Sequence, residues 1–189
     1  MKRLSILSVI VIVAFASCKK DDAAAPASVI TGTKTITVNF STASNYTLFR
    51  FSDSSVVANS DSATSKWDFG LRLTTFIVNS NAGGPGAGGA ILASGTFDAT
   101  TSAPSTGYAY DTTASQRAIK DGSWYAYNNT THVFAPQAGK VFIFKTADGA
   151  HYAKMELLAV ENGPIVGFTP VTLYYKFRYS YQANGTTTF

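Results

Sequence analysis

The stretch that decides the fold is VTLYYKFRYSYQ, residues 171–182. Every second residue in it is large and apolar or aromatic, namely Val171, Leu173, Tyr175, Phe177, Tyr179 and Tyr181. The residues between them are mainly polar, and this two-residue period is typical of a β-strand that buries one face. We therefore expect a long strand here, with its aromatic face on the core.

The same pattern recurs through most of the chain. We expect further strands at residues 33–40, 46–51, 67–73, 75–79, 91–97, 124–127, 141–145 and 152–160. Asp148-Gly149, between the last two, is typical of a tight hairpin turn. Only residues 112–120 could form a helix, and that segment is short and polar. The sequence therefore predicts one all-β domain over residues 33–189, either an antiparallel sandwich or a partly closed barrel.

Residues 67–73 carry a more detailed expectation about which side chains are buried. The residues expected to face the core are Trp67, Phe69, Leu71 and Leu73. Asp68 and Arg72 then share the opposite face, so Asp68 either pairs with Arg72 or accepts a hydrogen bond from a backbone N–H group.

Composition excludes several classes of protein. Of the 189 residues, 46% are hydrophobic and 13% aromatic, which argues against wholesale disorder. A single Cys excludes an intramolecular disulfide and any zinc site built on several Cys residues. A formal net charge of +4 is too small to indicate a nucleic-acid-binding protein.

The start of the chain has the form of a secretory leader. Lys2 and Arg3 precede an uncharged apolar run over residues 4–17, which is too short for a membrane-spanning helix. Phe15-Ala16-Ser17-Cys18 resembles a bacterial lipobox, which implies cleavage after residue 17 and lipidation of Cys18. The alternative is an ordinary signal peptide with a Cys nearby by chance. Without residues 1–17 the chain has 13 basic and 11 acidic residues, a net charge of +2.

The residues after Cys18 bear on localisation. Lys19-Lys20-Asp21-Asp22 resembles the surface-export signal of some Gram-negative lipoproteins. Residues 18–32 are expected to form a lipidated N-terminus and a flexible tether. The leader therefore indicates an outer-membrane lipoprotein, anchored by lipid and exposed at the cell surface.

Three stretches in a fixed order resemble one known family. They are WDFGLR (67–72) followed by NSN (79–81) and a Gly-rich loop, VFIFKTADG (141–149) with YAKM (152–155), and YKFRYSYQ (175–182). Behind a lipoprotein leader they look like the HmuY-like lipoproteins, and the resemblance covers residues 33–189. It implies an all-β surface protein that binds heme for iron acquisition and passes it to a TonB-dependent receptor. It also implies that two loop side chains, His or Met, hold the iron.

Candidate iron ligands are few in this sequence. The two His residues, His132 and His151, both lie beside expected turns and are the leading axial ligands for heme iron. Two donors must face each other across the iron, each at about 2 Å if they resemble other imidazole–metal bonds. Met155 is a further candidate, although core packing beside Ala153 and Leu157 also explains it. Two exposed loop histidines with no ligand remain the alternative.

Other residues could contact a porphyrin. Its rings could stack on aromatic residues of the central loops, namely Tyr108, Tyr110, Trp124, Tyr125 and Tyr127, which could equally fill the core. Arg72, Lys154 and Arg178 could pair with the propionates, or simply occupy solvated strand faces. A non-heme alternative for the whole chain is a surface binding or adhesion module that recognises a glycan or a protein.

Enzymatic activity is not expected. Residues 84–89 match G-x-G-x-x-G, but residues 91–97 follow as a strand, so no helix N-terminus is present to bind a dinucleotide. We expect residues 83–89 to be a flexible loop that gates a pocket or touches a partner. A hydrolase would need two close carboxylates, and the sequence does not bring any of the candidates together: Asp68, Asp98, Asp121 and Glu156.

Overall fold

A computed structural model of the chain describes residues 29–167 and 169–189. The predicted signal peptide, the lipidation site Cys18 and residues 19–28 of the predicted tether lie outside the described residues. Within them the chain is all-β, with one 3-10 turn, η1 (Asn59–Asp61), and no α-helix. No helix in this part of the chain is long and apolar enough to cross a membrane.

The larger of two sheets contains the strand from which the fold was predicted. Its five antiparallel strands lie in the order β1 (Val29–Asn39), β13 (Thr172–Gln182), β10 (Tyr152–Asn162), β9 (Lys140–Lys145) and β6 (Gly89–Ser94). The predicted strand β13 lies between β1, with which it pairs from Thr172 to Gln182, and β10, with which it pairs from Leu173 to Gln182. β1 begins at Val29, within the segment expected to be tether, because residues 29–32 pair with residues 179–182.

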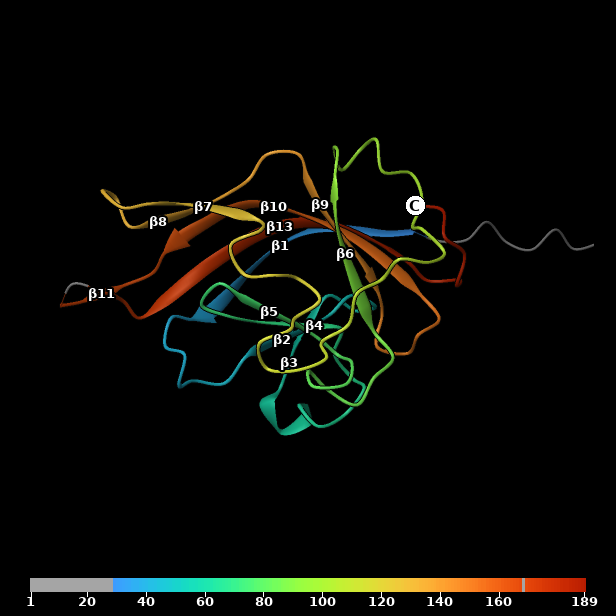
Figure 1. Ribbon diagram of the computed structural model, residues 1–189, viewed down its shortest axis with the longest axis horizontal. Helices are drawn as coiled ribbons and strands as arrows, with labels where there is room; N and C mark the ends of the chain where they lie inside the picture. Colours follow the sequence, from blue (N-terminus) through green and yellow to red (C-terminus); the bar gives the residue numbers. More distant parts are fainter. Residues whose placement is uncertain (1–28, 168) are drawn as a thin grey trace, which may run out of the picture.

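The smaller sheet has four antiparallel strands. They lie in the order β3 (Ser55–Val57), β2 (Thr47–Arg50), β4 (Phe69–Arg72) and β5 (Thr75–Val78). Aromatic rings join this sheet to the larger one. The centroids of Phe49 and Phe177 are 5.3 Å apart, and those of Phe76 and Phe142 are 5.0 Å apart. The two sheets do not close into a barrel, so the prediction of an all-β sandwich is confirmed (Figure 1).

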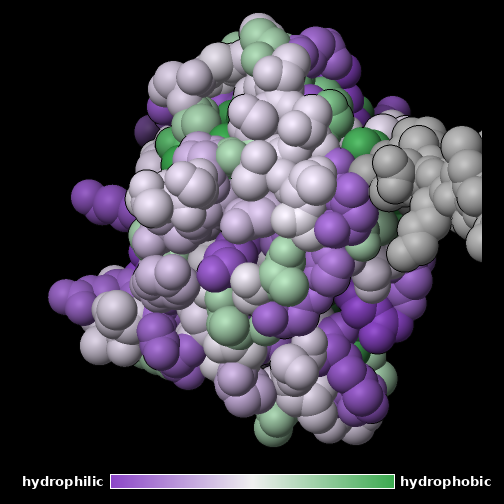
Figure 2. Space-filling view, turned by 90° about the vertical axis from the view of Figure 1, so that its right-hand side faces the viewer, coloured by the Kyte–Doolittle hydropathy of each residue, from purple (hydrophilic) through white to green (hydrophobic). Residues whose placement is uncertain are grey.

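Two small hairpins are not part of either sheet. One consists of β7 (Tyr125–Asn128) and β8 (Val133–Pro136), the other of β11 (Ile165–Val166) and β12 (Thr169–Pro170). Both project from the same end of the molecule, at the left of Figure 1. The opposite end, seen in Figure 2, is a mosaic of polar and apolar residues without a broad apolar surface.

The expected faces of residues 67–73 are only partly correct. Phe69 and Leu71 are buried between the sheets, but Trp67 packs in a separate cluster with Leu48 and Ile77 on the outer face of the smaller sheet. β4 begins only at Phe69, so the alternation expected from Trp67 onward does not apply to it. Leu73 lies in the turn after β4, with a φ of 49°.

Asp68 adopts the second of its two expected roles. It is 6% exposed and accepts hydrogen bonds from the backbone N–H groups of Phe51 (2.8 Å) and Ala147 (2.9 Å). Burial raises the pKa of this carboxyl to about 6. Because Phe51 follows β2 and Ala147 follows β9, Asp68 ties the two sheets together.

The helix considered at residues 112–120 does not form. The buried carboxylate of Asp111 accepts the N–H of Ala118 at 2.8 Å, and the N–H of Thr112 donates to the carbonyl of Gln116 at 3.0 Å. These contacts fold the segment into a loop around Asp111, since they use the groups that a helix would pair differently.

Candidate ligand-binding cleft between two hairpins

A row of aromatic rings leads along the first hairpin from the core to its tip. Trp124 is buried at 1% exposure, and its ring lies 4.7 Å from that of Tyr125. Phe134 of β8 contacts Tyr125 at 5.2 Å and Tyr127 at 4.8 Å. Tyr127, at the outer end of the row, is 45% exposed. The row therefore anchors the hairpin in the core and presents aromatic surface outside it.

The turn of this hairpin positions His132. Asn128 caps the turn: its side-chain oxygen accepts the N–H groups of Thr130 (2.8 Å) and Thr131 (3.0 Å), and its carbonyl accepts the N–H of His132 at 2.8 Å. His132 has a left-handed φ of 56°, which is uncommon for a residue other than Gly and is typical of such a tight turn. The sequence placed His132 beside a turn, and the structure shows that it ends the turn.

One nitrogen of the His132 ring is engaged by a neighbour. Nδ1 lies 2.8 Å from the hydroxyl of Tyr127 on the facing strand. When Nδ1 carries the ring proton and donates it to this hydroxyl, Nε2 holds the free lone pair. A second hydrogen bond of this kind fixes the tautomer and orientation of histidines that ligate metals. The orientation of the His132 ring is thus set by its own hairpin.

His132 and Tyr127 line a cleft of about 250 Å³. Its other lining residues are Phe40, Phe134, Thr169 and Pro170, so it lies between the two hairpins and the end of β1. Phe40 and Phe134 are half-buried and also pack on the main core, so this wall of the cleft is continuous with the core. Beyond the cleft, Ile165 (62% exposed) and Val166 (69% exposed) extend the apolar surface along β11.

His151 lies at the other end of β10 from this cleft. It directly precedes β10, whereas β11 and β12 follow that strand's far end. The 11 residues of β10 span about 35 Å at roughly 3.3 Å per residue. Two ligands of one iron must be roughly 4 Å apart. The structure therefore does not bring His132 and His151 together.

The side chain of His151 contacts neighbouring residues of the protein. Nδ1 lies 2.6 Å from the Asp148 carboxylate, and the ring packs 5.9 Å from that of Tyr181. Asp148 also accepts the N–H groups of Ala150 and His151 in the predicted hairpin turn. Met155 is fully buried in the main core, which agrees with the core-packing alternative for this residue.

Two of the three basic side chains expected to pair with heme propionates already bind other groups of the protein. Lys154 is 6% exposed, and Nζ donates to the carbonyls of Phe97 (2.8 Å) and Thr100 (2.7 Å). Arg178 binds Glu156 at 2.6 Å and Asp98 at 3.2 Å. The third, Arg72, lies on the smaller sheet and lines a different pocket.

The candidate carboxylates of a hydrolase are not arranged as a catalytic pair. Asp98 and Glu156 do approach each other, but Arg178 lies between them and forms an ion pair with both. Asp68 is buried between backbone N–H groups, and Asp121 accepts the N–H of Gly122 at 3.0 Å. No group of three or more His, Cys, Asp or Glu side chains suited to a metal ion occurs among the described residues.

The Gly-rich segment is held in place, contrary to the flexible loop expected. The N–H of Gly86 donates to the Asn79 side chain at 2.8 Å, and that of Ala87 donates to the carbonyl of Ala147 at 2.7 Å. A Cβ atom at Gly83 would lie 2.0 Å from the carbonyl oxygen of Val78. The glycines therefore serve close backbone packing between the two sheets.

Sequence reasoning missed the walls of the cleft. Phe40 was expected only as a strand residue, and nothing marked Thr169 and Pro170 as neighbours of His132, which precedes them by more than 30 residues. The aromatic residues expected to stack on a porphyrin do not all lie together. Trp124, Tyr125 and Tyr127 form the row, whereas Tyr108 packs on Tyr152 at 6.1 Å.

Comparison with known proteins adds no relative. No model of a protein family matches the chain, and no curated protein sequence matches it.

Proposed function

We propose that this protein is an outer-membrane lipoprotein of the HmuY type, exposed at the cell surface, that binds heme in the cleft between its two hairpins. The observation that supports this most strongly is the pairing of His132 Nδ1 with the Tyr127 hydroxyl at 2.8 Å, at the mouth of an apolar cleft. An imidazole with one nitrogen hydrogen-bonded and the other free is the usual form of a histidine that ligates a metal.

In the proposed site His132 is the one axial ligand, in place of the expected pair. His132 would hold the iron through Nε2, and the apolar rings of Phe40 and Phe134 would lie against the porphyrin. His151 has no place in this arrangement, since it lies at the opposite end of β10. When bound, heme supplies an iron centre that accepts imidazole nitrogen as a ligand. The role of the chain is to bind, orient and shield the group.

The apolar hairpin tip suits both ligand and receptor. Ile165 and Val166 are among the most exposed large apolar residues of the described chain, and both lie beyond the cleft on β11. Exposed apolar surface of this kind marks sites of interaction rather than of folding. In the proposed cycle a TonB-dependent receptor contacts this end of the protein and takes the heme.

The proposal also includes a lipid anchor at the N-terminal side of the folded domain. Cys18 would carry the lipid, and the folded domain begins with β1 at Val29, so residues 19–28 alone separate the two. About ten residues of extended chain reach roughly 33 Å, which leaves the domain close to the membrane surface.

Visible absorption titration with ferric heme tests the binding proposal. The wild-type protein should give a sharpened, shifted Soret band that saturates at one heme per chain. His132→Ala should lose this band, whereas His151→Ala, the matched control, should keep it. A free-heme spectrum in the wild-type protein, or a loss of the band only in His151→Ala, would contradict the proposal.

A further inference from the structure

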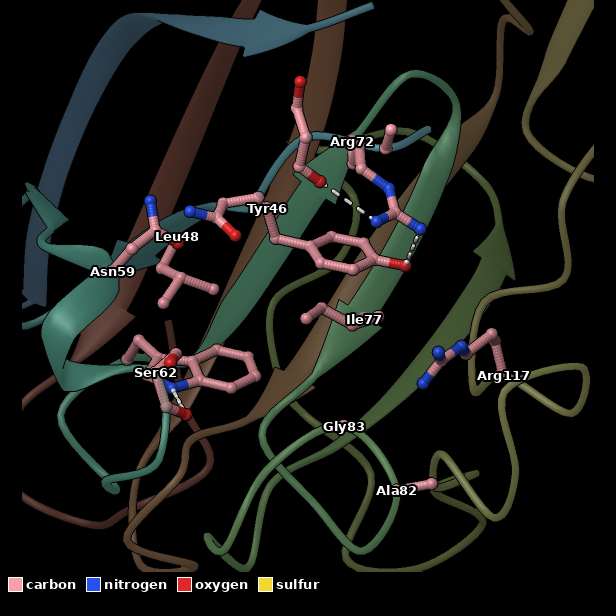
Figure 3. A pocket seen from close by; sticks show the side chains of 13 residues that line it. Tyr46, Leu48, Asn59, Ser62, Arg72, Ile77, Ala82, Gly83 and Arg117 are labelled. Carbon is pink, nitrogen blue, oxygen red and sulfur yellow. Dashed lines mark hydrogen bonds between the residues drawn. The ribbon is translucent and has the colours of Figure 1, made fainter. Parts of the chain in front are cut away.

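A second pocket, of about 350 Å³, lies on the outer face of the smaller sheet (Figure 3). Its floor is apolar and is formed by Leu48, Trp67 and Ile77, the cluster that packs outside the sandwich. Tyr46, Arg72 and Arg117 line its walls. The pocket shares no lining residue with the hairpin cleft, so it is a separate site.

Arg72 is fixed in one orientation but retains unused hydrogen-bond donors. Its guanidinium lies 4.3 Å from the centroid of the Tyr46 ring, and it donates to the carbonyl of Ser44 (3.0 Å) and to the Tyr46 hydroxyl (3.2 Å). Its Nε is buried and has no partner. Within the described residues no carboxylate lies within 4.0 Å of Arg72, so its charge is uncompensated at short range.

Arg117 approaches the pocket from the other side, and Figure 3 shows its side chain pointing toward Ile77. Nη1 binds the fully buried Asp111 at 3.1 Å, which holds the side chain at 14% exposure. The Nε of Arg117 is also buried without a partner. The lining thus contains two immobilised guanidinium groups and no acidic residue.

The chemistry of the walls defines the ligand. Guanidinium groups match the planar geometry of a carboxylate, and groups that are already ordered lose little entropy when they bind one. The amide side chains of Asn45 and Asn59 also line the pocket, and such groups pair with hydroxyls. The volume lies near the lower end of the range for ligand sites, about 300–1,000 Å³, which suits a single ring.

We propose that this pocket binds a sugar unit that bears a carboxylate, with the carboxylate held by Arg72 and Arg117 and the hydroxyl groups by Asn45 and Asn59. A uronic acid is the simplest such unit. The ligand is either the free uronic acid or a uronic acid at the end of a glycan. Both forms present the same carboxylate and hydroxyl groups.

Isothermal titration calorimetry with D-glucuronate, D-glucose and an oligosaccharide that ends in glucuronate tests this inference. Glucuronate should bind at least about 10-fold more tightly than glucose, because only the acid forms charge-assisted hydrogen bonds. Tighter binding of the oligosaccharide than of the monosaccharide identifies a glycan terminus as the source, and the reverse identifies the free acid. Equal binding of glucose and glucuronate, or no binding of either acid, would overturn the inference.

Variants locate the site. Arg72→Gln should weaken glucuronate binding by about 10- to 100-fold, the range expected for the loss of one charged hydrogen-bonding partner. Arg50→Gln is the matched control, because Arg50 belongs to the same sheet but pairs with Asp53 outside the pocket, and it should bind as the wild type does. The Nε–H resonances of Arg72 and Arg117 should shift when glucuronate is added to the wild-type protein. Unchanged resonances, or unchanged affinity in Arg72→Gln, would refute the site.

Discussion

The hydroxyl of Tyr127 and Nδ1 of His132 lie 2.8 Å apart across the β7–β8 hairpin. The turn capped by Asn128 brings the two residues together within the hairpin. The pair stands between two projecting hairpins, where the aromatic row ends and the apolar cleft begins. The proposed heme site rests on this pair and on the apolar walls beside it.

Tyr127→Phe tests this relationship. The change keeps the ring that packs on Phe134 but removes the hydroxyl that orients His132. Loss of such an outer partner typically costs about 10- to 100-fold in metal affinity, so heme affinity should fall by that amount without being abolished. The measurement is an absorption titration with ferric heme. Affinity equal to that of the wild type would show that the hydroxyl does not orient the ligand.

Protonation of Asp68 should contribute to the pH dependence of the free energy of unfolding. Because burial raises its pKa in the folded protein to about 6, the native state keeps a proton between about pH 4 and pH 6 that the unfolded chain has lost. This group therefore raises the free energy of unfolding as the pH falls through that window, by up to about 3 kcal/mol for a shift of roughly two units.

Urea denaturation of the wild type and Asp68→Asn at several pH values measures this effect. The variant should be less stable at every pH, because its amide cannot accept hydrogen bonds from both Phe51 and Ala147. The stability difference in favour of the wild type should also widen as the pH falls from 6 to 4. A difference that stays constant, or narrows toward acid, would contradict a raised pKa.

A buried hydroxyl supports the turn between β4 and β5. Tyr175 is fully buried on β13, and its hydroxyl donates to the carbonyl of Leu73 at 2.6 Å. Tyr175→Phe leaves this carbonyl without its partner and should lower the free energy of unfolding by about 1–3 kcal/mol. Tyr174→Phe, on the opposite face of the same strand, should change it by less than about 0.5 kcal/mol. Similar losses in the two variants would remove the basis of this prediction.

The Gly-rich segment should respond sharply to added side-chain atoms. In Gly83→Ala the new methyl group would meet the Val78 carbonyl at 2.0 Å, which forces the backbone to shift and should cost about 2–3 kcal/mol. Gly88→Ala brings its nearest contact only to 3.1 Å and should cost clearly less. Thermal unfolding of both variants measures the difference. Equal and small effects would show that the segment is mobile after all.

Strand periodicity was a reliable guide where one face is buried. β13 was predicted almost to the residue because large apolar and aromatic residues alternate along it and are buried, namely Leu173, Tyr175, Phe177, Tyr179 and Tyr181. β3, β8, β11 and β12 were missed, since these strands of two to four residues are too short to show a period.

Only the part of the candidate site that comes from one short segment of the chain was predictable from the sequence. His132 stands out in the sequence as one of two histidines, and its place beside a turn was correct. That His151 lies far from it follows from the antiparallel path of β9 and β10, which periodicity alone does not give. Arg72 and Arg117 are likewise 45 positions apart, and only the loop around Asp111 brings the second to the first.

The most direct test of the heme site is an NMR titration of the 15N-labelled protein with gallium protoporphyrin, a diamagnetic analogue of heme. The amide resonances of Phe40, Tyr127, His132, Phe134 and Thr169 should shift most, because these residues line the cleft between the hairpins. Resonances around His151 should remain in place. Shifts centred on His151, or spread evenly over the sandwich, would contradict binding in the hairpin cleft.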